Sequence, residues 1–187
     1  IAIIVLLVGI LVPVVQEALV HVQVVRSAAI VQNLGAACES YKTTNGYYPG
    51  QQYISHVGVY TGGGNDVYTG SQYLAKSLFV QGAAWAPSFS AESVFDATGT
   101  NDGGGSVQLP DSITDQFSDP MAVLYFPARL GLDEQYDIND NIQYVRGNGD
   151  EGSFNPDPAV YADKFVIVAA GKDRKYFTSD DLTYPNK

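Results

Sequence analysis

The chain has 187 residues, and its 20 acidic and 10 basic side chains give it a formal net charge of −10 at pH 7. This balance argues against nucleic acid as a partner and against docking on anionic lipid, because both ligands select clusters of Lys and Arg. Hydrophobic residues make up 45% of the chain, which predicts one folded domain with an appendage rather than a disordered protein. A lone cysteine, Cys38, excludes a disulfide within the chain.

Residues 1–44 are predicted to form one long helix with two parts. Residues 1–15 carry no charge and no side-chain amide, which places them in lipid or inside a bundle of helices. In residues 16–44 the apolar side chains recur every three to five positions, and this spacing indicates an amphipathic helix with one wet face. The Asn-Gly pair and the proline of TTNGYYPG at 43–50 are expected to end the helix.

Gly9 and Pro13 interrupt the apolar part of this helix. Because proline lacks a backbone N–H and clashes with the carbonyl one turn back, we expect a kink or local unwinding there. An apolar run of 15 residues is also shorter than the roughly 20 residues that span a bilayer. We therefore expect either further residues in front of Ile1 or packing of the run against copies of itself.

Residues 45–187 are predicted to form a globular domain that contains a Gly- and Tyr-rich insertion at about residues 50–118. Within the insertion, SQYLAKSLFVQG at 71–82 predicts a short helix, with Ser71 as its N-cap and Gly82 at its end. The runs TGGGND and GTNDGGGS on either side of that helix are typical of turns.

Three β-strands are predicted in the last third of the chain, at residues 122–126, 142–146 and 165–170. The third is apolar throughout, so we expect it at the centre of the sheet and packed on the long helix. Sequential strands with short connections favour an antiparallel sheet. The predicted fold class is α+β: a long protruding N-terminal helix packed by its C-terminal half on a small antiparallel β-sheet.

The sequence contains no pattern typical of a catalytic site. The two histidines, His21 and His56, are not part of any motif, and HExxH, GxSxG and CxxC are all missing from the sequence. Paired carboxylates occur in turns such as Asp133–Glu134, where solvated side chains are the default interpretation. We therefore expect that the protein is not an enzyme.

The segment AAGKDRKYFTSDDL at 169–182 is the best candidate for binding chemistry. After the predicted strand ends, Asp173, Asp180 and Asp181 fall in one loop together with hydroxyl side chains. Calcium takes six to eight oxygen ligands from such loops. On these residues alone an ordinary acidic turn is the simpler interpretation, and calcium is the alternative; no other cofactor is expected.

The N-terminal helix resembles that of type IV pilins and of type II secretion pseudopilins. The resemblance rests on IAII at 1–4, on Gly9 and Pro13, and on YKTTNGYYP at 41–49. It implies that roughly nine more residues precede Ile1, which would bring the helix to spanning length, and that the helix unwinds near Pro13 in filaments. It also implies that the chain assembles through this helix, with the following assembly residues: Ile3, Leu7, Gly9, Leu11, Pro13 and Leu19.

The C-terminal half resembles the pseudopilin branch of the same family. DPMAVLYF at 119–126 is similar to the family segment DPWGNPYLY, and the 169–182 segment is similar to the ending SAGPDGKFGTDDDI, which holds calcium in major pseudopilins. The chain departs from that ending where Arg174 and Phe177 replace glycines. If those positions need φ > 0, bulkier side chains strain the loop, and Arg174 also adds a positive charge. By position, the resemblance implies these calcium ligands: Asp173, Asp180 and Asp181.

The resemblance implies a structural subunit of a helical type IV pilus-like extracellular filament, built from many copies of the chain. The subunit would be held in the inner membrane before assembly and would be handled by pilus or secretion assembly machinery. The alternative within the family is a periplasmic pseudopilin of a type II secretion system. A further alternative is a membrane-anchored adhesin or glycan-binding domain, because the 13 tyrosines would suit stacking on sugars.

Overall fold

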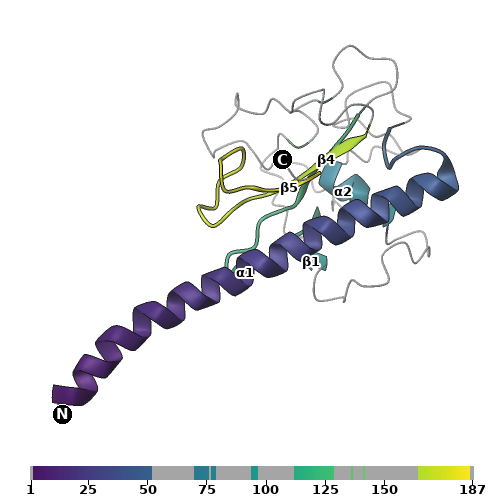
Figure 1. The fold of residues 1–187 in the computed structure, drawn as a ribbon. Coiled ribbons are helices and arrows are strands. Elements are labelled where there is room, and N and C mark those ends of the chain that lie inside the picture. The colour runs from purple at the N-terminus through teal and green to yellow at the C-terminus, as the bar shows by residue number, and fades with distance from the viewer. Residues whose placement is uncertain are drawn as a thin grey trace.

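The protein has an α+β fold, in which one long helix lies against a small antiparallel sheet (Figure 1). The predicted fold class is therefore confirmed. Within the long helix, α1 (Ala2–Asn45), side chains are described for Leu7, Gly9 and every residue from Leu11 onward. The computed structural model describes the backbone of residues 2–51, 70–75, 77–78, 94–96, 112–128, 136, 141 and 164–185.

α1 is a continuous α-helix that contains Pro13. Of the kink or local unwinding predicted near Gly9 and Pro13, the unwinding is not found in this structure, in which the helix curves gently toward its N-terminus (Figure 1). The carbonyl that faces the proline ring one turn back belongs to Gly9, and no atom lies within 4 Å of the position that a Cβ on Gly9 would occupy. An uncrowded backbone can absorb the missing hydrogen bond in a gradual bend.

The C-terminal end of α1 lies at the Asn-Gly pair, as the sequence predicted. Gly46 has φ of 85° and donates its N–H to the Lys42 carbonyl at 2.8 Å, which is the left-handed ending that glycine favours. The Asn45 side-chain amide donates to the Tyr41 carbonyl at 3.0 Å, so a second carbonyl of the last turn gains a partner. Lys42 stands in the last turn, where the helix dipole favours a positive charge.

The sheet has three antiparallel strands in the order β3 (Leu124–Pro127), β4 (Phe165–Ala169) and β5 (Leu182–Tyr184). Tyr125 pairs with Ile167 in one ladder, and Ile167 pairs with Tyr184 in the other. The central place of β4 and its packing on α1 were predicted. β5 was not predicted, because three residues before a proline carry little strand signal, and the predicted strand at 142–146 lies outside the described residues.

Smaller elements extend the domain beside β3. α2 (Gly70–Ala75) corresponds to the helix predicted at 71–82 and begins one residue earlier; it is described to Ala75. A second, two-stranded sheet joins β1 (Val94–Asp96) to β2 (Ser112–Ile113). The side-chain amide of Asn141 donates to the Tyr125 carbonyl and its oxygen accepts the Ser71 N–H, so this one buried residue ties α2 to β3.

β4 is buried on both faces, which explains why its sequence is apolar at every position. Phe165, Ile167 and Ala169 belong to the core cluster that includes Leu34 and Cys38 of α1. Val166, Val168 and Ala170 belong to a second cluster, which Tyr176 and the partly buried Phe177 cover. The loop after β4 therefore acts as the outer layer of the sheet.

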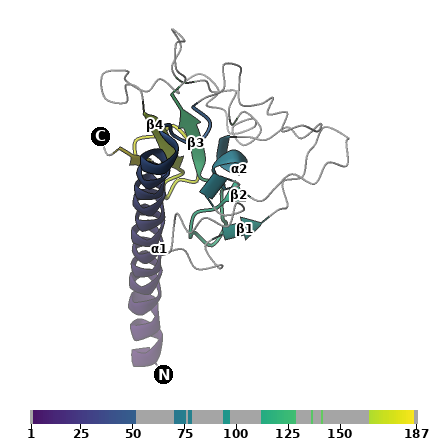
Figure 2. The ribbon, with the colours of Figure 1, turned by 90° about the vertical axis from the view of Figure 1, so that its right-hand side faces the viewer.

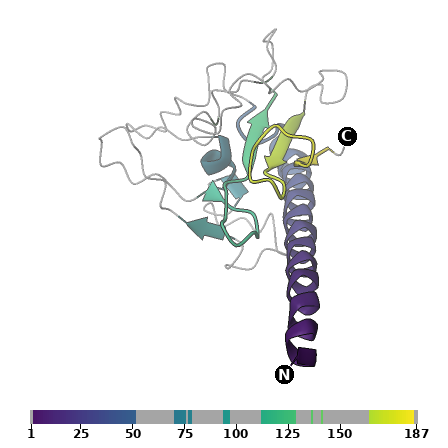
Figure 3. The same cartoon turned by 90° about the vertical axis from the view of Figure 1, so that its left-hand side faces the viewer.

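The domain covers only the C-terminal part of α1. Among the α1 side chains that the structure describes, Ser27 is the first buried one, and Ile30, Leu34 and Tyr41 follow on the same face. Figures 2 and 3 show the strands and α2 gathered beside that part, whereas the N-terminal part of α1 extends beyond the domain.

A close contact between Gly35 and Tyr184 joins α1 to the last strand. A Cβ on Gly35 would lie 2.5 Å from the Tyr184 ring, so only glycine lets the ring rest on the helix backbone. The same ring stacks on Phe165, with centroids 5.5 Å apart and planes 10° from parallel. Tyr184 is therefore held between the helix and the central strand and cannot move aside freely.

We predict that Gly35→Ala destabilises the domain by about 1–2 kcal/mol, because the added methyl group displaces the Tyr184 ring from Phe165. Urea unfolding of the full chain in detergent would measure this loss. Gly9→Ala is the matched control on the same helix, since its new Cβ meets no atom within 4 Å. A loss of the same size in both variants would show that the Tyr184 contact is not the cause.

Candidate assembly surface and C-terminal loop

Large apolar side chains of α1 are exposed along the part of the helix that extends beyond the domain. In the described residues, these side chains have 40% to 61% of their surface accessible. A soluble protein rarely exposes a contiguous apolar patch of this extent, so the surface calls for a lipid or protein partner. The exposed residues are Leu7, Leu11, Val12, Val14, Val15, Leu19, Val20, Val22 and Val25.

Part of this surface forms a stripe on the side of α1 that faces away from the domain. Successive residues of an α-helix are rotated by about 100°, so Val25 lies nearly opposite the buried Ser27. Leu11, Val14 and Val22 share the side of Val25. We call this set, Leu11, Val14, Val22 and Val25, the outward stripe.

The structure exposes five of the six predicted assembly residues: Leu7, Gly9, Leu11, Pro13 and Leu19. The side chain of Ile3 lies outside the described residues. By length and composition, the stretch Leu11–Asn45 is also suited to crossing a membrane, and 17% of the residues in its apolar window are buried in the domain. The role of these residues in assembly stays a prediction.

The loop at residues 171–181 connects β4 to β5 and brings its two ends into contact. A Cβ on Gly171 would lie 2.4 Å from the backbone oxygen of Asp180 and 2.5 Å from its carboxylate. Only glycine permits this approach. The two ends of the loop therefore lie against each other, with Asp180 and Asp181 directly before β5.

The three predicted calcium ligands accept hydrogen bonds from the loop itself. The Asp173 carboxylate accepts the Lys175 N–H at 2.9 Å. The Asp180 carboxylate accepts the Asp173 N–H at 3.1 Å and the Thr178 hydroxyl at 2.7 Å. In the part of the chain that the structure describes, no three acidic, histidine or cysteine side chains converge as a metal-ligating group.

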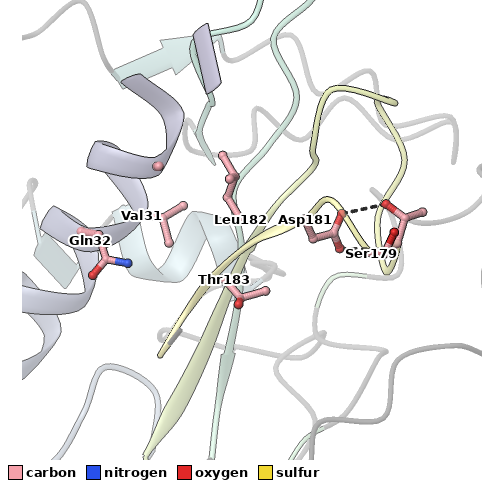
Figure 4. Close-up of a pocket in the computed structure, with 8 residues that line it drawn as sticks. Val31, Gln32, Ser179, Asp181, Leu182 and Thr183 are labelled. Atoms are coloured by element: carbon pink, nitrogen blue, oxygen red, sulfur yellow. Dashed lines mark hydrogen bonds between the residues drawn. The ribbon is translucent and has the colours of Figure 1, made fainter. Parts of the chain in front are cut away.

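Asp181 is the most enclosed of the three carboxylates. Its Oδ2 atom accepts the Phe177 N–H at 2.6 Å and the Thr178 N–H at 3.3 Å. Burial raises the pKa of Asp181 to about 6, and these hydrogen bonds oppose the rise. Asp181 also lines a pocket of about 420 Å³ between the loop and α1, but its side chain points along the loop rather than toward the helix (Figure 4).

Arg174 joins the same loop to the segment before β3. Its Nη1 atom lies 2.8 Å from Asp115 Oδ2, and its Nη2 atom lies 3.3 Å from Asp115 Oδ1. Nη2 also donates to the Asp119 carbonyl, and the guanidinium carbon lies 4.5 Å from the centroid of the Phe117 ring. The Asp115 side chain is fully buried and that of Arg174 is 21% exposed, so this two-pronged ion pair is largely shielded from water.

Arg174 and Phe177 both have a positive backbone φ. This agrees with the glycines that stand at these two positions in the family ending that the loop resembles. The φ angles are 59° and 64°, in the left-handed region that disfavours side chains with a Cβ. Arg174 offsets this cost with its ion pair. Phe177 offsets it by packing on Phe126, with ring centroids 6.3 Å apart.

The partnership of Arg174 with Asp115 was not predicted from the sequence. The two residues are 59 positions apart, and DSITDQFSDP around Asp115 resembles an ordinary acidic turn. The available signal was the substitution of a glycine by an arginine, which suggested a positive charge in the loop but could not name its partner.

Comparison with known proteins adds no relative. The chain matches no protein-family model, no curated protein and no solved structure. We therefore infer the function from the chain's own surfaces.

We predict that Arg174→Met destabilises the protein on the order of 3 kcal/mol at neutral pH, because it leaves the buried Asp115 carboxylate without its cation. Burial already raises the pKa of Asp115, an effect that Arg174 opposes, so the variant raises this pKa further. A native pKa above the unfolded one means that the variant gains stability as the pH falls through the native pKa. The loss relative to the original protein should shrink in mildly acidic buffer.

Urea unfolding at a series of pH values would measure this dependence. Lys172→Met removes the same charge from an exposed position of the same loop and should change little at any pH. A loss for Arg174→Met that is equal at neutral and acidic pH would contradict the role given to Asp115.

Proposed function

We propose that this protein is the structural subunit of a helical, type IV pilin-like filament, assembled through α1. The observation that carries the proposal is the apolar surface of α1 from Leu7 to Val25, which is exposed beyond the domain. The α+β arrangement, with a long helix packed by its C-terminal part on a small antiparallel sheet, is compatible with a pilin-like fold.

A bundle of identical helices is the arrangement that best covers this surface. The outward stripe lies opposite the domain. The α1 helix of a second subunit can therefore approach the stripe without meeting the strands of the subunit that carries it. Contacts between unlike faces of identical subunits generate a ring where the rotation closes and a helical filament where it does not; the filament is the arrangement that we propose here. The domains would then lie on the outside and the apolar helices in the core.

Before assembly, the same apolar helix would be stored in a membrane. The stretch Leu7–Val25 contains one formal charge, at Glu17, and a bilayer hides apolar side chains as well as a bundle does. We propose an inner-membrane precursor that assembly machinery transfers to a cell-surface filament. A periplasmic pseudopilin of a secretion system would use α1 in the same way, and its filament would be short.

We predict that Leu11→Lys abolishes filament formation, because a charge on the outward stripe would be buried without a partner in the bundle. Ser40→Lys is the control, since Ser40 is exposed near the polar end of α1. Filaments would be counted by negative-stain microscopy of sheared cell-surface material. The folded domain should be intact in both variants, with unchanged melting of the purified chain.

Two results would contradict the proposal. One is normal filaments from Leu11→Lys. The other is the original protein found solely in membrane fractions with no filament, which would favour a membrane-anchored adhesin or glycan-binding domain.

We predict that Pro13→Ala stiffens α1 and alters or abolishes assembly. The substitution restores an N–H opposite the Gly9 carbonyl and favours the helix by about 3 kcal/mol, so it resists any unwinding that packing with neighbours requires. Microscopy would compare the number and the helical repeat of the filaments. Filaments identical to those of the original chain would show that unwinding at this position is dispensable.

A further inference from the structure

The loop at residues 171–181 contains positively charged side chains as well as aspartates. It contains three basic and three acidic residues, so its formal charge is zero before any ion binds. A loop that depends on calcium usually offers excess negative charge, because the ion must be neutralised by its ligands. Here Lys172 and Lys175 bring positive charge into the loop beside the carboxylates, and Arg174 adds a third positive charge that pairs with Asp115 outside the loop.

The carboxylates of the loop are also already in use. They accept hydrogen bonds of 2.6–3.1 Å from the backbone N–H groups of Asp173, Lys175 and Phe177 and from the Thr178 hydroxyl. A calcium ion would have to displace several of these donors to collect six to eight oxygens. The side chains present therefore do not fit a calcium site in this conformation.

We propose that the Arg174 guanidinium takes the role of a bound calcium ion in this loop, so that the loop folds against the segment before β3 through Asp115 and without metal. The guanidinium supplies a fixed positive charge in a planar fork that matches a carboxylate. Unlike an ion, it cannot dissociate. The inference does not depend on the filament proposal.

The ion pair acts on the parts of the domain that surround it. Tyr176, two residues after Arg174, donates its hydroxyl to the Ala122 carbonyl at 2.6 Å and covers the outer face of the sheet. Next to Asp115, the Gln116 N–H donates to the hydroxyl of Ser27 on α1 at 3.0 Å. Arg174 thus links the loop that covers the sheet to the segment that contacts α1 where the helix leaves the domain.

The test measures loop order and stability with calcium and with a chelator. The full chain in detergent micelles would be studied by hydrogen exchange of residues 171–181 and by thermal melting. For the original protein we expect the same protection and the same midpoint in millimolar calcium as in excess chelator, because a ligand that does not bind the folded state cannot stabilise it. In Asp180→Asn, too, the loop protection and the melting midpoint should be the same in calcium as in chelator.

Variants then test the cation itself. Arg174→Met should lose the protection of the loop and lower the midpoint by roughly 5 °C or more. Lys172→Met, which removes the same charge from an exposed position, should keep both. Asp115→Asn should resemble Arg174→Met, and the double variant should lose less than the sum of the two single losses, because the pair acts as one interaction.

Two outcomes would overturn the proposal. The first is a calcium-dependent rise in the midpoint or loop protection of the original protein that Asp180→Asn or Asp181→Asn removes. The second is a loop in Arg174→Met that remains as protected as in the original chain. Neither outcome bears on whether filaments form, so the two proposals can fail separately.

Discussion

The structure depends on a mismatch between one helix and the domain that covers it. α1 carries large exposed apolar side chains from Leu7 to Val25, yet among the described side chains full burial against the domain begins at Ser27. The uncovered apolar part must therefore lie against lipid or against other helices, and it sets both the shape of the molecule and the class of function that we propose.

The covered part of α1 is fixed by contacts that leave little freedom. Gly35 lets the Tyr184 ring rest on the helix, and Tyr184 in turn stacks on Phe165 of the central strand. Because β4 is buried on both faces, the loop after it has to cover the second face with Tyr176 and Phe177. The core on this side of the sheet stays covered only while that loop is held in place. The ion pair between Arg174 and Asp115 holds it, and this is why the pair matters for stability.

Periodicity and turn chemistry predicted the local elements well. The end of α1 at the Asn-Gly pair and the central, wholly buried β4 were both predicted, because each follows from a run of neighbouring residues. The sequence did not settle the choice between a kink and local unwinding at Pro13, where the structure has a gentle bend. It also missed β5, whose three residues form a strand because β4 offers them a partner. Neither outcome is encoded in the adjacent sequence alone.

The sequence by itself determined that the chain has a strongly apolar helix, a small sheet and a C-terminal loop that contains three aspartates, since these depend on composition and spacing. Only the tertiary structure decided which side of α1 stays uncovered, because the answer depends on where the sheet packs. It also decided that Arg174 reaches Asp115, 59 residues away, and that the loop carboxylates bond to backbone N–H groups. Such pairings depend on how distant segments meet in space, and no spacing along the chain reports them.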